Sequence, residues 1–198
     1  TIGIVQGNEL FAVDITFDNQ YILAAGSVSQ GEAAYISQIS NLPVASTLPT
    51  AFGNRTITSA RWSPDGNYIA TGRDGIIGDM QSDLQVYAFN PDQNPTTTDL
   101  TSMQLLDLGS VMGVDWSPTG DRLAVVSNNF AGTIFIYRFD PQSLPVLTLE
   151  STFSSGSISG GGRVVRWSPC GNFVAAGFDD PINGGVIVAV DTVSLVHI

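Results

Sequence analysis

The stretch SARWSPDGNYIATG, at Ser59–Gly72, decides the fold because the chain repeats it. It returns as GVDWSPTGDRLAVV at Gly113–Val126 and as VVRWSPCGNFVAAG at Val164–Gly177. A weaker copy, VDITFDNQYILAAG, lies at Val13–Gly26, where we align Phe17 with the tryptophans and the turn is one residue shorter. The aligned positions 17, 62, 116 and 167 are 45, 54 and 51 residues apart, a spacing typical of a repeated four-stranded unit.

Each copy carries the local signals of two strands joined by a tight turn. Val114 and Trp116 alternate with Asp115, the period of a strand, and Ser-Pro-x-Gly suits a turn because proline fixes φ and glycine tolerates positive φ. Pro and Gly interrupt every window long enough for a helix, so the sequence predicts an all-β fold. Further strands are predicted at 33–39, 84–89, 133–139 and 185–190, and outer strands at 44–48, 103–108 and 146–152.

The WSPDG, WSPTG and WSPCG units, each followed by an apolar strand, resemble WD40-type β-propeller repeats and are similar to those of TolB-type and lactonase-like propellers. The resemblance covers nearly all of the chain and implies four-stranded antiparallel blades. We expect a single propeller segment, 1–198, with approximate blades at 1–43, 44–101, 102–144 and 145–193 and an extra outer strand at 194–198. At the anchors Phe17, Trp62, Trp116 and Trp167, we expect rings wedged between blades; a stacking platform for a sugar or base is the alternative.

The chain departs from the WD40 pattern at its polar positions. The Gly-His pair that opens many WD40 repeats is missing, since the only histidine is His197, and so is the Trp-Asp pair that closes the third strand. The family's buried His–Asp–Ser–Trp network is therefore not expected, and cohesion should come mainly from apolar packing between blades.

Four blades pose a question of closure, because propellers have about four to eight. Both Thr1–Val5 and Ser194–Ile198 are predicted outer strands, whereas closing one ring needs only one. We therefore favour a part of a longer propeller over pairing with another copy or partner, and both over a ring closed on four blades. A start at Thr1 instead of Met indicates processing, trimming or a fragment.

Composition excludes several function classes. The chain has 18 acidic residues against 7 basic ones, all arginine, and its net charge of −11 disfavours binding to nucleic acid or insertion at anionic membranes. The single Cys170 cannot form an intramolecular disulfide or a cysteine-based metal site. An extracellular or cell-surface location is slightly favoured over a cytoplasmic one.

The sequence offers few residues for chemistry. Weak candidates for a calcium site are Asp74, Asp79 and Asp83 in one loop and Asp179 and Asp180 at the equivalent place in the last blade, although solvated turn carboxylates explain them better. There is no Gly-x-Ser-x-Gly elbow, and the glycine run at 160–162 lacks a lysine and leads into a strand. No catalytic residue and no cofactor are predicted.

These observations favour a noncatalytic interaction or assembly scaffold, with a protein partner or further propeller blades (another segment or another copy) as its partner. One alternative is a lactonase-like or other hydrolase, or a small-ligand-binding propeller, with an axial site built from loops. A second alternative is a self-assembling extracellular structural protein.

Overall fold

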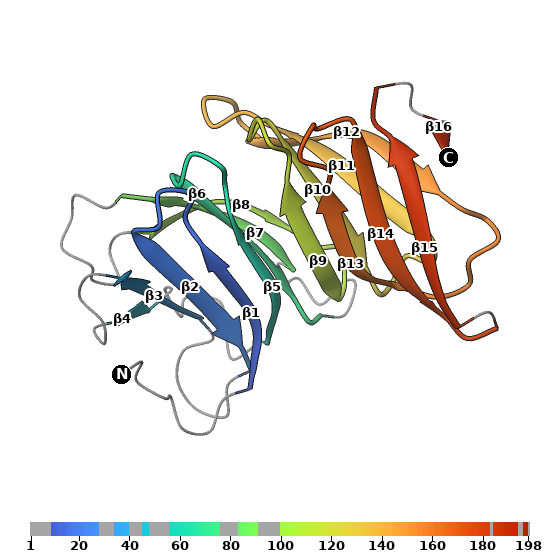
Figure 1. The fold of residues 1–198 in the computed structure, drawn as a ribbon, viewed down its shortest axis with the longest axis horizontal. Coiled ribbons are helices and arrows are strands. Elements are labelled where there is room, and N and C mark those ends of the chain that lie inside the picture. The colour runs from blue at the N-terminus through green and yellow to red at the C-terminus, as the bar shows by residue number, and fades with distance from the viewer. Residues whose placement is uncertain are drawn as a thin grey trace.

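The computed structural model describes residues 9–27, 34–39, 45–47, 56–75, 83–90, 100–182, 184–193 and 196–197. They form four antiparallel four-stranded sheets that lie side by side (Figure 1). Within each sheet the strands follow one another in sequence order, from the inner strand outwards, so four consecutive strands make one blade. Among the described residues every regular element longer than one turn is a strand, and no helix is long and apolar enough to cross a membrane.

The strands of blades 1 and 2 are β1 (Leu10–Ile15), β2 (Tyr21–Gly26), β3 (Ala34–Gln38), β4 (Ala45–Thr47), β5 (Ile57–Trp62), β6 (Tyr68–Arg73), β7 (Leu84–Phe89) and β8 (Leu100–Leu106). Those of blades 3 and 4 are β9 (Val111–Trp116), β10 (Arg122–Ser127), β11 (Thr133–Phe139), β12 (Leu147–Ser154), β13 (Gly162–Trp167), β14 (Phe173–Asp180), β15 (Gly184–Asp191) and β16 (Val196–His197).

The blade boundaries differ from the predicted ones. The prediction placed each outer strand at the start of the following unit, but β4 pairs with β3, β8 with β7 and β12 with β11. The boundaries at 43, 101 and 144 are therefore wrong. Likewise β16 pairs with β15 and completes blade 4, so 194–198 is not an extra strand. The predicted strand at Thr1–Val5 lies outside the described residues.

The turn between the first two strands has the same hydrogen bonds in blades 1 and 2. In blade 2, the Ser63 N–H donates to Tyr68 O at 2.8 Å and the Gly66 N–H donates to Ser63 O at 2.9 Å. In blade 1, the Asn19 N–H donates to Thr16 O at 2.8 Å. Asn19 takes the place of the turn glycine, with φ 59° against 73° for Gly66, a conformation that asparagine tolerates better than most residues.

Blade 1 therefore has a turn of full length, and our alignment of Phe17 is wrong. Ile15 ends β1 where the tryptophans end β5, β9 and β13, and Phe17 stands at the proline place of the turn. The Phe17 side chain is 89% exposed, so it anchors nothing within the described part of the chain. The turn glycine's replacement by asparagine concealed this register in the sequence.

The hydrophobic core consists of three clusters, each filled by side chains from two neighbouring blades. Between blades 1 and 2, Tyr21 meets the Phe89 ring edge-on, with centroids 5.0 Å apart, and Phe89 meets Trp62 in the same way. An equivalent aromatic triad joins blades 2 and 3, and it consists of Tyr68, Phe139 and Trp116. Edge-on pairs add about 0.5–1.5 kcal/mol each beyond the area that they bury.

The four blades form an open arc. The inner strands β1, β5, β9 and β13 lie in this order along its inner edge (Figure 1), but no comparable packing joins blade 4 to blade 1 in the described part of the chain. The internal strands β6 and β10 are buried on both faces after their first residue, whereas residues of β14 alternate between buried and more accessible. A ring closed on four blades is therefore not adopted.

Candidate functional site: an axial charge row and two open faces

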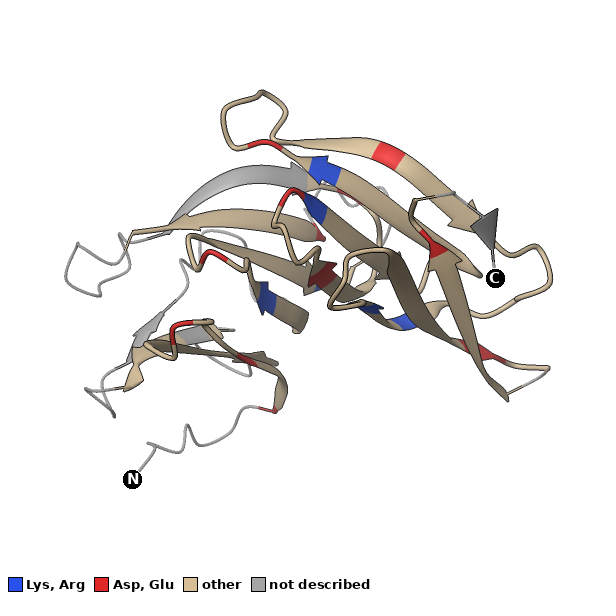
Figure 2. Cartoon of the chain, turned by 45° about the horizontal axis from the view of Figure 1, so that its top comes forward, with Lys and Arg blue, Asp and Glu red and all other residues tan. Residues whose placement is uncertain are grey.

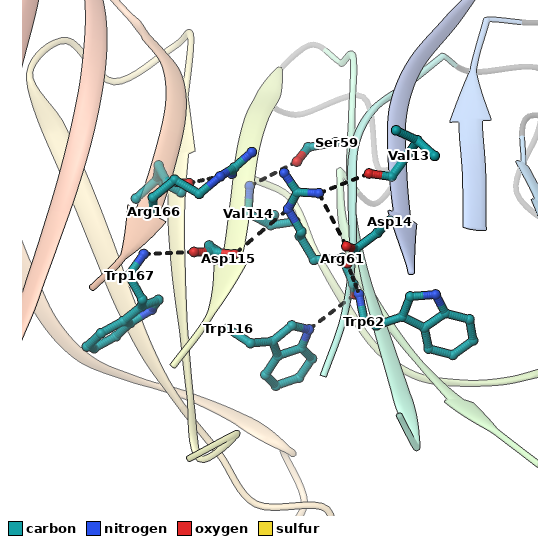
Figure 3. A network of polar contacts seen from close by, with 11 residues as sticks. Val13, Asp14, Ser59, Arg61, Trp62, Val114, Asp115, Trp116, Arg166 and Trp167 are labelled. Atoms are coloured by element: carbon teal, nitrogen blue, oxygen red, sulfur yellow. Dashed lines mark hydrogen bonds and ion pairs between the residues drawn. The ribbon is translucent and has the colours of Figure 1, made fainter. Parts of the chain in front are cut away.

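Each inner strand carries a charged residue directly before its last residue, and the sign alternates from blade to blade. These residues, which we call the axial charge row, are Asp14, Arg61, Asp115 and Arg166 (Figure 3). The rest of the acidic residues lie mostly in turns and at strand ends (Figure 2). The inner edge is thus a place where charges of both signs from four blades lie in one row.

The two aspartates of the row join neighbouring blades. Asp14 Oδ2 accepts a hydrogen bond from the backbone N–H of Trp62 at 2.8 Å, and Asp115 Oδ2 accepts one from the backbone N–H of Trp167 at 2.7 Å. Hydrogen bonds to a charged acceptor are short and strong. Blades 1 and 2, and blades 3 and 4, are therefore held by polar contacts as well as by apolar packing.

Arg61 lies between the two aspartates. Its guanidinium is 3.7 Å from Asp14 Oδ1 and 3.8 Å from Asp115 Oδ1, and its Nη1 donates to Val13 O at 3.1 Å. The Arg61 carbonyl accepts a hydrogen bond from the Trp116 indole at 3.2 Å. Arg61 therefore contacts both neighbouring blades.

The ionisation of Asp115 reflects its position. Burial raises the pKa of this carboxyl above its ordinary value, opposed by the hydrogen bond from Trp167 and by the charges of Arg166 and Arg61. Because burial prevails over these three stabilising contacts, the carboxyl takes up a proton more readily than an exposed aspartate.

Two hollows flank the axial charge row. One, of about 290 Å³, is bordered by all four inner strands and contains the side chains of Arg61, Arg163 and Arg166. The other, of about 360 Å³, lies toward the turns and is lined by all four residues of the row together with parts of the turns. The inner edge of the arc is the part of the described structure where residues from four blades converge.

The predicted metal candidates do not converge. Asp79 lies outside the described residues. Asp83 and Asp180 are buried, and their carboxylates accept backbone N–H groups at 2.8 to 3.1 Å. Asp74 accepts from a serine hydroxyl, and Asp179 pairs with an arginine at 2.9 Å. No group of three His, Cys, Asp or Glu side chains among the described residues could hold a metal ion.

The three tryptophans lie in the clusters between blades. Trp62 and Trp116 are 5% exposed and Trp167 is 8% exposed, so their rings are covered by packing. The indole N–H groups of Trp62 and Trp167 are buried and have no hydrogen-bond partner among the described residues. Sequence reasoning found these three anchors but missed the charge row, whose signal is a charged residue immediately before each tryptophan and before Ile15 in blade 1.

Blade 4 has an open apolar face. Val164, Phe173 and Ile187 are 43%, 40% and 81% exposed on it. By register Ile187 corresponds to Leu84 in blade 2 and Ile134 in blade 3, which are 0% and 1% exposed because the next blade covers them. The open face of blade 4 is thus equivalent to the faces of blades 2 and 3 that the next blade covers.

Phe173 shows the same relation. It begins β14 as Tyr21 begins β2 and Tyr68 begins β6, and both tyrosines contact a phenylalanine of the following blade. Blade 1 has an open face at the other end of the arc, where Val13 and Ile15 are 64% and 48% exposed. Blade 4 therefore exposes the face that normally contacts the following blade, and blade 1 exposes the face that normally contacts the preceding blade.

Comparisons with known proteins agree with this architecture. A family model for the WD domain, G-beta repeat, matches residues 46–77, and no curated protein matches the chain. Among solved structures, the chain is similar to the β-propeller domain of Myceliophteria thermophila Cps50 (Swd1), with 15% identity, a TM-score of 0.63 and coverage of 92% of this chain and 53% of that one.

A second similar structure is the periplasmic gluconolactonase PpgL of Pseudomonas aeruginosa, with 16% identity, a TM-score of 0.64 and coverage of 94% of this chain and 54% of that one. The chain therefore spans about half the length of each. At these identities the likeness shows the fold alone: four blades of a β-propeller with WD40-like repeats.

Proposed function

Starting from a β-propeller with WD40-like repeats, we propose that the chain is a noncatalytic scaffold for interaction and assembly, whose open faces pack against further propeller blades. The observation that carries the proposal is the open face of blade 4. Ile187 is 81% exposed there, whereas the residues at its place in blades 2 and 3 are buried. An apolar face that is equivalent to internal interfaces is suited to another blade.

Two further observations support further blades as the occupant. The chain spans about half of the propellers to which it is similar, so a closed ring of that size has room for about as many blades again. The axial charge row also ends with Arg166 at one end and Asp14 at the other. A neighbouring blade with a carboxylate before its anchor would place opposite charges side by side at blade 4, as in the rest of the row.

The proposal is tested with the purified chain alone, because the only further blades then available to an open face are those of another copy of the chain. Sedimentation velocity over a range of protein concentrations should show association of the unmodified chain. Ile187→Asp should shift the population to monomer, since a carboxylate in that interface would lose its hydration. The matched control is Leu149→Asp, which changes an apolar residue, 51% exposed on outer strand β12, and should leave the association unchanged.

A chain that stays monomeric at all concentrations, or that responds equally to both substitutions, would overturn the proposal. Electron micrographs add a second readout. Particles of limited size would support assembly into propeller rings. Fibres of indefinite length would instead favour the alternative hypothesis of a self-assembling structural protein. The extracellular or cell-surface location is part of the proposal, supported by the acidic composition.

One observation favours the second candidate, a small-ligand-binding propeller. The hollow of about 290 Å³ is bordered by residues of all four inner strands, the arrangement expected of an axial site. The binding measurements described in the next subsection test this candidate without assuming a reaction.

A further inference from the structure

The hollow of about 290 Å³ concentrates positive charge in an acidic protein. Three of the seven basic residues, Arg61, Arg163 and Arg166, line it, although the net charge of the chain is −11. Its other lining residues are neutral: Phe11, Ala12, Val13, Thr58, Ser59, Met112, Gly113 and Val164. No carboxylate is among these described lining residues, so the hollow differs from the one on the turn side, which contains both aspartates of the row.

Two guanidinium groups lie close enough to repel each other. Figure 3 shows Arg61 and Arg166 directed toward the same region. Partial burial and the charge of Arg61 lower the pKa of Arg166, opposed by the charges of Asp115 and Asp14. Within the described residues Arg166 makes one hydrogen bond, from Nη1 to Val165 O at 2.7 Å. A guanidinium has five N–H donors, so most of those of Arg166 remain for a ligand.

Within the described residues, no aspartate of the row forms a hydrogen bond with Arg61 or Arg166. The Oδ2 atoms of the two aspartates accept backbone N–H groups of the tryptophans, and their Oδ1 atoms are 3.7 and 3.8 Å from Arg61, beyond hydrogen-bond distance. Arg163 pairs with Asp179 at 2.9 Å, but both side chains are well exposed, so solvent weakens this pair. The positive charge of the hollow is therefore only partly neutralised.

Ser59 adds a neutral donor. Its side chain is largely buried, at 9% exposure, and lines the hollow. Ser59 Oγ accepts the backbone N–H of Val114 at 3.2 Å, and no acceptor for its hydroxyl proton lies within the described part of the chain. A buried hydroxyl normally donates a hydrogen bond, and a ligand oxygen in the hollow would receive it.

We propose that this axial hollow binds a small oxyanion, a carboxylate or phosphate group, through Arg61, Arg166 and the hydroxyl of Ser59, with Arg163 nearby. Guanidinium groups suit such ligands because their paired N–H groups match two oxygens of one anion. A volume of about 290 Å³ lies at the small end of ligand sites, so the ligand is a small molecule.

The test is calorimetric titration of the chain with inorganic phosphate and, separately, with succinate at constant ionic strength. At least one should bind with a stoichiometry near one per chain, and the stronger binder identifies the chemistry of the ligand. Arg166→Gln should weaken binding on the order of tenfold to a hundredfold, the loss of a hydrogen bond to a charged group. Ser59→Ala should weaken it by a smaller factor.

Arg138→Gln is the matched control, because it removes the same charge from an exposed residue of β11 outside the hollow. It should change the affinity less than about twofold, since exposed charges at a distance are screened. Equal losses for both arginine variants would show diffuse attraction and overturn the site, as would no binding of either anion. Ile187→Asp should leave anion binding intact, so the failure of the assembly proposal and of this one are distinguishable.

Discussion

Replacing Phe139 by leucine should destabilise the chain more than its change in size implies. The Phe139 ring meets Tyr68 at 4.8 Å and Trp116 at 5.0 Å, both edge-on, and the first contact crosses from blade 2 to blade 3. Two such pairs at about 0.5–1.5 kcal/mol each give about 1–3 kcal/mol in addition to the smaller buried area. Urea unfolding followed by circular dichroism measures the change in free energy of unfolding.

Phe153→Leu provides the matched control. Phe153 is a partly buried phenylalanine packed against the next cluster, and it makes no ring contact with another described residue. Its replacement should lower the free energy of unfolding by about 1 kcal/mol or less. A double-mutant cycle of Tyr68→Leu with Phe139→Leu should give a coupling of about 0.5–1.5 kcal/mol. Equal effects of the two phenylalanine substitutions together with no coupling would refute the role of the aromatic triad.

Three further results are expected. Gly72→Ala should lower the free energy of unfolding by about 1–3 kcal/mol or abolish soluble expression, because the added Cβ would lie 2.8 Å from a backbone oxygen of β9. In the control Gly185→Ala, the added Cβ meets nothing within 4 Å, so the substitution should be neutral. Folding raises the pKa of Asp115, so the stability that the protonated carboxyl contributes is present at low pH and is lost as the pH rises through that pKa. The urea midpoint of Asp115→Asn should therefore exceed that of the unmodified chain at about pH 7. This gain should vanish near about pH 4. Cys170 is exposed and its pKa is lowered by the Ser168 hydroxyl, so a disulfide reagent should modify it in the native protein, and more slowly in Ser168→Ala below pH 8.

The fold was accessible from the sequence because one local signal repeats. Strand, Ser-Pro-x-Gly turn and strand each depend on neighbouring residues, and the repeats at Trp62, Trp116 and Trp167 fixed the register of three blades. Blade 1 was misaligned because an asparagine, Asn19, stands where the other turns have glycine. Without that glycine as a marker, the alignment relied on matching Phe17 to the tryptophans. Backbone conformation, and not aromatic character, decides which residues correspond.

The blade boundaries could not be obtained in the same way. An outer strand such as β4 has few sequence signals of its own, and only its pairing with β3 shows to which blade it belongs. The axial hollow was missed for a related reason. Arg61, Arg163 and Arg166 come from two blades more than 100 residues apart, and they meet only because the inner strands of the blades lie side by side.

The axial charge row adds polar contacts to the apolar packing that the sequence predicted as the main source of cohesion between blades. At the inner edge, two carboxylates accept tryptophan N–H groups, and an arginine lies between them. Apolar faces tolerate many partners of similar shape, but a charge placed beside one of like sign is unfavourable. In the proposed assembly, the alternation from Asp14 to Arg166 would favour a neighbouring blade whose charge continues it, in addition to the fit of the open apolar faces.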